Sequence, residues 1–89
     1  MGKEVVKRGG RLERRNVALA ARYFYWSEMK RRRFDDVIGI LENDEFFVEY
    51  QTISRIIFAY GAYFEDLRSM LPGYRVKLLK REFPSWNWE

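Results

Sequence analysis

The stretch FDDVIGILENDEFFVEYQTISRII, residues 34–57, decides the fold, because two segments with helical apolar spacing flank a short turn. Asp35 and Asp36 can accept hydrogen bonds from free backbone N–H groups, so they mark the start of the first helix. This helix should run to about Asp44. Its buried stripe has the i, i+3 and i+4 spacing of Val37, Ile40 and Leu41.

The second helix of the stretch begins near Glu49, after the apolar turn EFFV, and has two different faces. At about 100° per residue, its core face consists of Ile53, Ile56, Ile57 and Tyr60. Gln51 and Arg55 lie one turn apart on the opposite side, flanked by Thr52 and Ser54. Gln can pair with adenine and Arg with guanine in a major groove, and the two hydroxyls can reach phosphate oxygens. An ordinary solvated helix face is the alternative interpretation.

The N-terminal part predicts an arm and a long helix. Residues 1–12 carry no apolar periodicity and predict a flexible basic arm, so one helical domain spans residues 13–89. Asn16 is the expected N-cap of a largely apolar, central helix, which ends in the cations Lys30, Arg31, Arg32 and Arg33. Within it, most rings of RYFYW, residues 22–26, are expected in the core; stacking on the bases of a single strand is the alternative.

Two further helices are expected after the helix pair. A short one covers residues 63–71 and is closed by Pro72 and Gly73. The last contains Val76, Leu79 and Phe83 on one stripe and is stopped by Pro84. The whole pattern predicts an all-α fold, a small bundle of about four to five helices with a helix-turn-helix at about residues 35–60.

The composition argues against several kinds of chemistry. The 89 residues contain neither cysteine nor histidine, which removes disulfides, thiolate nucleophiles, the commonest zinc ligands and the usual general base. We therefore expect no enzyme, no catalytic residue, no cofactor, no metal site and no small-molecule substrate. The longest uncharged run, residues 56–64, is shorter than the roughly 18 residues that span a bilayer, so no membrane segment is expected.

The net charge of +4 conceals a strong segregation along the chain. Residues 1–33 carry eleven Lys or Arg against three Asp or Glu; residues 34–73 carry two against eight, and residues 74–89 four against two. Clustered cations suit phosphate, because counterion release favours their binding to polyanions. The acidic middle segment would not bind DNA on charge alone.

The sequence FFVEYQTISRII resembles the turn and recognition helix of bacterial helix-turn-helix proteins. With RRNVALAARYFYW and RRRFDDVIGIL upstream, residues 14–60 are similar to small DNA-binding proteins of bacterial mobile elements and prophages, including transposase-associated and Mor-like regulators. The resemblance implies that Val48 is the buried turn residue and that Ile53 and Ile56 anchor the recognition helix. It also implies a DNA-facing side made of Gln51, Thr52, Ser54 and Arg55. Phe47 stands where such motifs usually place glycine.

The first expected function is sequence-specific binding of double-stranded DNA by a regulator or recombination-associated factor of a bacterial mobile element. Gln51 and Arg55 would enter the major groove, while Thr52, Ser54 and the cations of residues 30–33 would hold the backbone. Such a protein is expected in the cytoplasm, associated with the nucleoid.

The second expected function is a helical protein-interaction module. Its acidic middle and the aromatic residues Trp86 and Trp88 would bind a partner chain. A homodimer through the C-terminal segment is a separate expectation, because Phe83, Trp86 and Trp88 would otherwise expose apolar area on a short tail.

Overall fold

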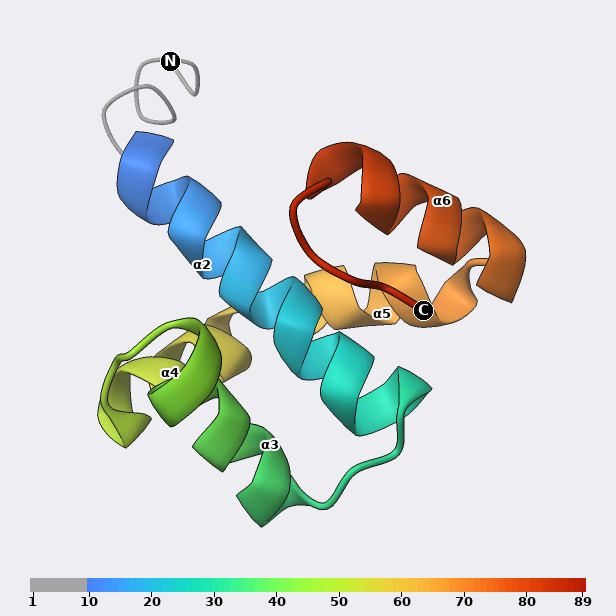
Figure 1. Cartoon of the computed structure of the whole chain (residues 1–89). Helices are drawn as coiled ribbons and strands as arrows, with labels where there is room; N and C mark the ends of the chain where they lie inside the picture. The colour runs from blue at the N-terminus through green and yellow to red at the C-terminus, as the bar shows by residue number, and fades with distance from the viewer. Residues whose placement is uncertain (1–9) are drawn as a thin grey trace.

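The computed structural model describes residues 10–89 and shows an all-α fold (Figure 1). The fold class predicted from the sequence is therefore confirmed. Within this range there are five α-helices and no strand. The helices are α2 (Gly10–Phe24), α3 (Phe34–Ile40), α4 (Tyr50–Ala59), α5 (Gly61–Ser69) and α6 (Pro72–Glu82). Two of them continue into wider π-helical turns, α2 into η1 (Tyr25–Met29) and α3 into η2 (Leu41–Glu45).

Helix α2 begins earlier than the sequence predicted. Asn16 is not an N-cap but lies inside the helix, where its Oδ1 accepts hydrogen bonds from Arg15 Nε and Nη2 at 3.2 and 3.0 Å. Residues 10–12, predicted as part of the arm, are helical; the rest of that arm lies outside the described residues. The physical reason is that Arg, Leu and Glu are good helix formers, so the helix extends beyond its apolar part.

Helix α2 occupies the centre of the molecule, as its apolar circumference predicted. Its side chains Leu19, Ala20, Ala21 and Phe24 are buried, and it contacts α4, α5 and η2. Figure 1 shows α3 and α4 on one side of α2, and α5 and α6 on the other. A helix that must pack against neighbours on several sides needs apolar residues around most of its surface.

The connection between α2 and α3 corrects the predicted end of the first helix. The helix ends at Met29, where the backbone N–H of Lys30 donates to the carbonyl of Tyr25 at 2.8 Å. Residues 31–33 are not helical, and Arg31 has a left-handed backbone with φ of 57°. The cations therefore form a loop before α3 rather than the last turn of α2.

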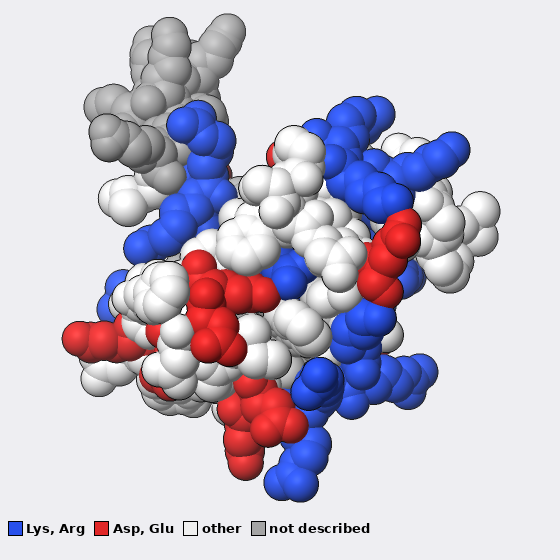
Figure 2. Space-filling view, viewed as in Figure 1, with Lys and Arg blue, Asp and Glu red and all other residues white. Residues whose placement is uncertain are grey.

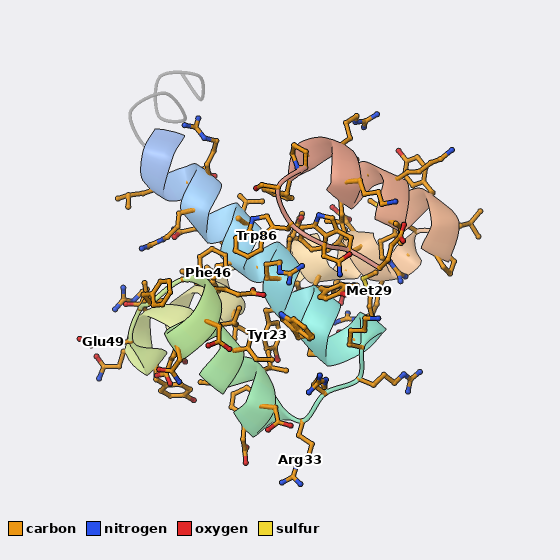
Figure 3. All side chains as sticks on the ribbon, viewed as in Figure 1. Tyr23, Met29, Arg33, Phe46, Glu49 and Trp86 are labelled. Carbon is orange, nitrogen blue, oxygen red and sulfur yellow. The ribbon has the colours of Figure 1, made fainter. Side chains whose placement is uncertain are left out.

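The C-terminal tail packs into the core of its own chain. Trp88 is 1% exposed, and its indole N–H donates to the carbonyl of Phe83 at 3.0 Å. Its ring meets Tyr25 edge-on at 5.7 Å, while Trp86 stacks on Phe46 at 5.3 Å (Figure 3). The expectation that Phe83, Trp86 and Trp88 expose apolar area was wrong for Trp88, which is buried, whereas Phe83 and Trp86 are half-buried against the core. The reason given for a homodimer at this segment is thereby weakened.

Arg22 joins three distant parts of the chain inside the core. Its Nε and Nη2 donate to the two carboxylate oxygens of Glu45 at 3.0 and 2.7 Å, and its Nη1 donates to the backbone carbonyl of Asn87. Four rings surround the guanidinium at 4.5–5.3 Å from their centroids: Tyr25, Trp26, Trp86 and Trp88. The aromatic run of residues 22–26 is thus mainly core, as predicted, and it encloses a cation.

Candidate nucleic-acid interface

Helices α3 and α4 are joined by a turn of residues 46–49 that follows η2. At its start, the backbone N–H of Phe46 donates to the carbonyl of Leu41 at 3.0 Å. At its end, Glu49 has an extended backbone, and its carbonyl accepts hydrogen bonds from the N–H groups of Thr52 and Ile53 at 3.0 and 3.1 Å. Helix α4 therefore starts one residue after the predicted position, and the segment has the predicted order of helix, turn and helix.

Phe47 supplies the change of direction in this turn. Its φ is 56°, in the left-handed region that side chains rarely adopt, and its ring is 72% exposed. This is the position where the resembling motifs place glycine. Val48, next in the chain, is half-buried against the core, so the turn residue predicted to be buried is covered only in part.

Helix α4 has the two faces that its sequence predicted. Ile53 and Ile56 are buried, and Ile57 and Tyr60 are half-buried against the same core. Among the predicted DNA-facing residues, Gln51, Ser54 and Arg55 are exposed and Thr52 is half-buried. Within residues 10–89, no hydrogen bond or ion pair engages the side chains of Gln51, Ser54 or Arg55. These donors and acceptors are available to a partner.

Exposed apolar side chains extend the same outer surface. Phe58 is 90% exposed, and Phe47 and Tyr50 are also exposed. Phe58 lies seven residues after Gln51 and so falls on the same side of α4. In a major groove such a ring can contact the methyl group of thymine, and on a protein partner it can serve as an anchor.

The cations of residues 30–33 lie at the other end of the α3–η2 segment. All four side chains are exposed, and Arg33 approaches Asp35 at 4.0 Å. Figure 3 shows Arg33 and Glu49 at separate edges of the molecule. Twelve helical residues between them span roughly 18 Å at about 1.5 Å per residue. Because a major groove is about 12 Å wide, cations at this separation can meet a backbone beside a groove that holds α4.

Charge is segregated in space as well as in sequence. Figure 2 shows carboxylates mainly over α3 and η2, and Lys and Arg side chains over α6 and the loop before α3. Exposed carboxylates near the candidate reading helix are those of Asp44 and Glu49, with Asp35 and Asp36 at the start of α3. Phosphates close to α4 would therefore meet the negative charge of these residues, and the cations that could offset it are Arg55 on α4 itself and, farther away, those of residues 30–33.

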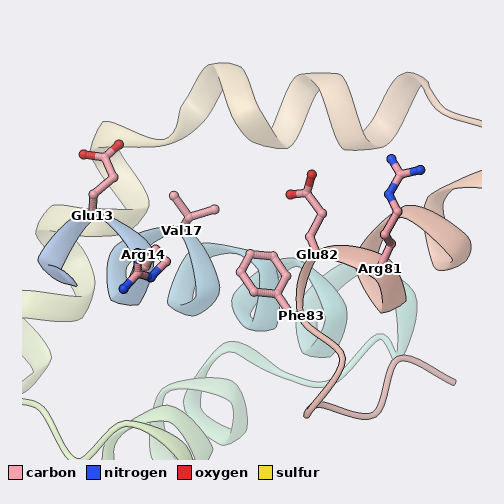
Figure 4. Close-up of a pocket in the computed structure, with 6 residues that line it drawn as sticks. All are labelled: Glu13, Arg14, Val17, Arg81, Glu82 and Phe83. Carbon is pink, nitrogen blue, oxygen red and sulfur yellow. The ribbon is translucent and has the colours of Figure 1, made fainter. Parts of the chain in front are cut away.

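A pocket of about 420 Å³ lies between the first turns of α2 and the end of α6 (Figure 4). Val17 and Phe83 form its apolar part, and its charged residues are Glu13, Arg14, Arg81 and Glu82. On the neighbouring helix α5, burial raises the pKa of Tyr63 to about 12, with the negative charge of Glu82 acting in the same direction. The pocket contains two carboxylates and two guanidinium groups and no nucleophile.

Two further observations concern the chain outside this surface. In the part of the chain that the structure describes, no three acidic residues come together as a possible metal site. None of the described helices has the length and apolar character needed to cross a bilayer.

Comparison of the chain with protein-family models, with curated proteins and with solved structures gives no significant match.

Sequence reasoning did not single out the cations of α6. Lys77, Lys80 and Arg81 are exposed and follow an i, i+3, i+4 pattern, which places them on one side of that helix. The pattern was visible in the sequence, but only the structure shows that Lys80 of α6 and Lys30 of the loop contact the same residue, Glu89.

Proposed function

We propose that the protein binds double-stranded DNA in a sequence-specific manner through α3, the turn and α4. The observation that carries this proposal is the geometry of α4. Ile53 and Ile56 are buried and anchor α4 to the core, directly after a turn with a left-handed residue. Gln51 and Arg55 are exposed on the opposite side of α4, one helical turn apart. That arrangement suits a recognition helix, whose first turns lie against base edges.

In the proposed complex, each exposed group of α4 has a distinct task. Gln51 pairs with adenine and Arg55 with guanine, each through two hydrogen bonds. Ser54 and Thr52 donate to phosphate oxygens beside the groove, and the cations of residues 30–33 contact the backbone at the other end of α3. The resemblance to small regulators of mobile elements suggests transcription control or recombination as the process served, on DNA in the bacterial nucleoid.

The proposal is tested by selecting binding sites from random duplexes at physiological salt. We expect one defined sequence to be enriched. On the selected site, Arg55→Ala should cost roughly 1–3 kcal/mol of binding free energy and relax the choice at one base pair. Equal affinity of the Arg55→Ala protein for the selected site and for a site changed at that one base pair, with the wild type discriminating between them, would support base reading by this residue.

Two control variants separate base reading from other effects. Arg68→Ala removes the same charge from α5, where Arg68 is half-exposed and paired with Glu28 at 2.9 Å, so it should leave base preference unchanged. Ile53→Ala should destabilise the fold by roughly 2–5 kcal/mol and reduce binding only through unfolding. A folded Arg55→Ala protein with undiminished site preference contradicts the proposed role of α4.

A protein-interaction module is the second candidate function. Of the tryptophans first assigned to it, Trp88 is buried in the core and Trp86 is half-buried against it, so neither is a free anchor for a partner. The specific observation in its favour is the exposed group of Phe47, Tyr50 and Phe58 on and beside α4. Failure to enrich any sequence from random duplexes, together with a partner whose binding Phe58→Ala abolishes, would favour this function.

A further inference from the structure

Helix α6 and the loop of residues 30–33 meet at one residue near the end of the described chain, Glu89. The ammonium group of Lys30 donates to the backbone carbonyl of Glu89 at 2.6 Å. The ammonium group of Lys80 donates to the side-chain carboxylate of the same residue. Two segments separated by about half the chain therefore each place one cation, Lys30 and Lys80, at Glu89.

Exposed cations outnumber the carboxylate of Glu89 on these two segments. They are the four cations of residues 30–33 and, on one side of α6, Lys77, Lys80 and Arg81. We call these seven residues the basic strip. Within residues 30–33 and 77–81, no large apolar side chain is exposed, because Leu79 is buried and Leu78 is half-buried. A surface made of cations without exposed apolar groups suits a regular line of phosphates better than the interior of a lipid layer.

The α6 part of the strip lies apart from the candidate reading face. Helix α4 packs on α2 with Ile53 and Ile56 inward, so its exposed face points away from α2. Helix α6 lies across α2 from α4 in Figure 1. A partner on α6 therefore approaches a different part of the surface from a partner on the outer side of α4.

We propose that the basic strip binds the phosphate backbone of a nucleic-acid duplex without reading its sequence, and that the Glu89 carboxylate holds Lys80 in the place that a phosphate takes in the complex. This binding goes beyond the proposed function, because it requires neither Gln51 nor Arg55. Phosphate replaces the carboxylate with a group of the same sign and a richer set of acceptor oxygens. In the free protein, the contact with Lys80 holds the pKa of Glu89 below its usual value.

The first test removes the competing carboxylate and is measured on a duplex without the selected site. Glu89→Gln should tighten binding of the full chain several-fold at low salt, because Lys80 becomes free to contact phosphate. Asp66→Asn is the matched control, since it changes the net charge by the same amount at an exposed carboxylate on α5, which belongs neither to the strip nor to α4. Equal gains from the two variants would show that net charge alone governs binding, which overturns the proposal.

The second test removes cations from the strip. Lys77→Gln combined with Lys80→Gln should make the slope of log K against log salt shallower by up to about two contacts' worth, while Lys77→Arg with Lys80→Arg retains it. An unchanged slope in the Gln variant, with an unchanged melting temperature, overturns the proposal. DNA and RNA duplexes are tested separately, and binding to either supports a backbone contact.

Vesicles containing phosphatidylserine provide the remaining comparison. If vesicles bind the chain through the same lysines and neither duplex competes with them, the strip is a lipid-binding surface and the proposal is wrong. These tests do not depend on α4. Arg55→Ala is assessed by its sequence preference, whereas the Lys77→Gln, Lys80→Gln variant is assessed by the salt dependence of binding, so the two proposals can fail separately.

Discussion

Glu45→Ala should remove a large part of the stability of this fold, because it leaves the guanidinium of Arg22 buried without its counter-charge. The Arg22 side chain is 4% exposed and the Glu45 side chain 10%. Two charge-assisted hydrogen bonds, at 3.0 and 2.7 Å, are lost at once, and each such bond contributes about 1.5–3 kcal/mol. The indole N–H of Trp26 also loses its acceptor, Glu45 Oε2 at 3.1 Å.

The expected loss is roughly 3–5 kcal/mol of unfolding free energy, the range found when one partner of a buried ion pair is removed. Small domains have about 5–15 kcal/mol in total, so the variant should melt more than about 10 °C lower. Urea unfolding followed by tryptophan fluorescence measures the change directly, because Trp26, Trp86 and Trp88 surround Arg22.

Two comparisons isolate burial as the cause. Glu28→Ala removes the carboxylate from another Arg–Glu pair, which has three hydrogen bonds to Arg68, but that pair is half-exposed and should contribute no more than about 1 kcal/mol. Arg22→Met combined with Glu45→Leu should destabilise far less than the sum of the single variants, because neither charge is left buried alone. If Glu45→Ala costs no more than Glu28→Ala, the pair does not anchor the core.

Two further predictions concern the turn and the alkaline pH range. Phe47→Gly should change the unfolding free energy by less than about 1 kcal/mol, because the Phe47 side chain is exposed and glycine adopts a φ of 56° without strain. Phe47→Val should destabilise the fold by roughly 1–2 kcal/mol, because a branched side chain is strained at this φ. Equal stabilities of the two variants in thermal melting would contradict the left-handed turn. The raised pKa of Tyr63, about 12 against an ordinary 10.0, contributes stability that is fully present below pH 10 and is lost as the pH rises to about 12, since the unfolded phenol ionises first. Tyr63→Phe should therefore flatten the fall in stability across this pH range, and an unchanged pH profile in urea unfolding would refute the assignment.

The helix pair around the turn shows how much of the candidate site was predictable. The spacing of Val37, Ile40 and Leu41, and of Ile53 and Ile56, predicted both helices and the exposed side that carries Gln51 and Arg55. Periodicity is a local property of the chain, so it predicts which side of a helix is buried before any partner helix is known. It predicted the bounds less well, because wide turns and helix ends depend on what packs against them.

The packing of the C-terminal tail against the core was not predicted from the sequence, for a related reason. Residues after Pro84 are too few to show a period, so Trp86 and Trp88 looked like exposed aromatic groups. Their burial depends on Tyr25, Phe46 and Arg22, which lie about 40 to 65 residues away in the sequence. A single sequence does not reveal which distant residues provide such a surface.

The sequence by itself determined that this protein is all-α, that α2 is apolar around most of its circumference, and that α4 presents a polar side, because these follow from residue type and helical spacing. Only the tertiary structure decided that Arg22 pairs with Glu45, that the C-terminal tail completes the core, and that Lys30 and Lys80 meet at Glu89. Each of these contacts joins segments that are distant in the chain. The energy of such a contact depends on burial and geometry, and these exist only after the helices have packed.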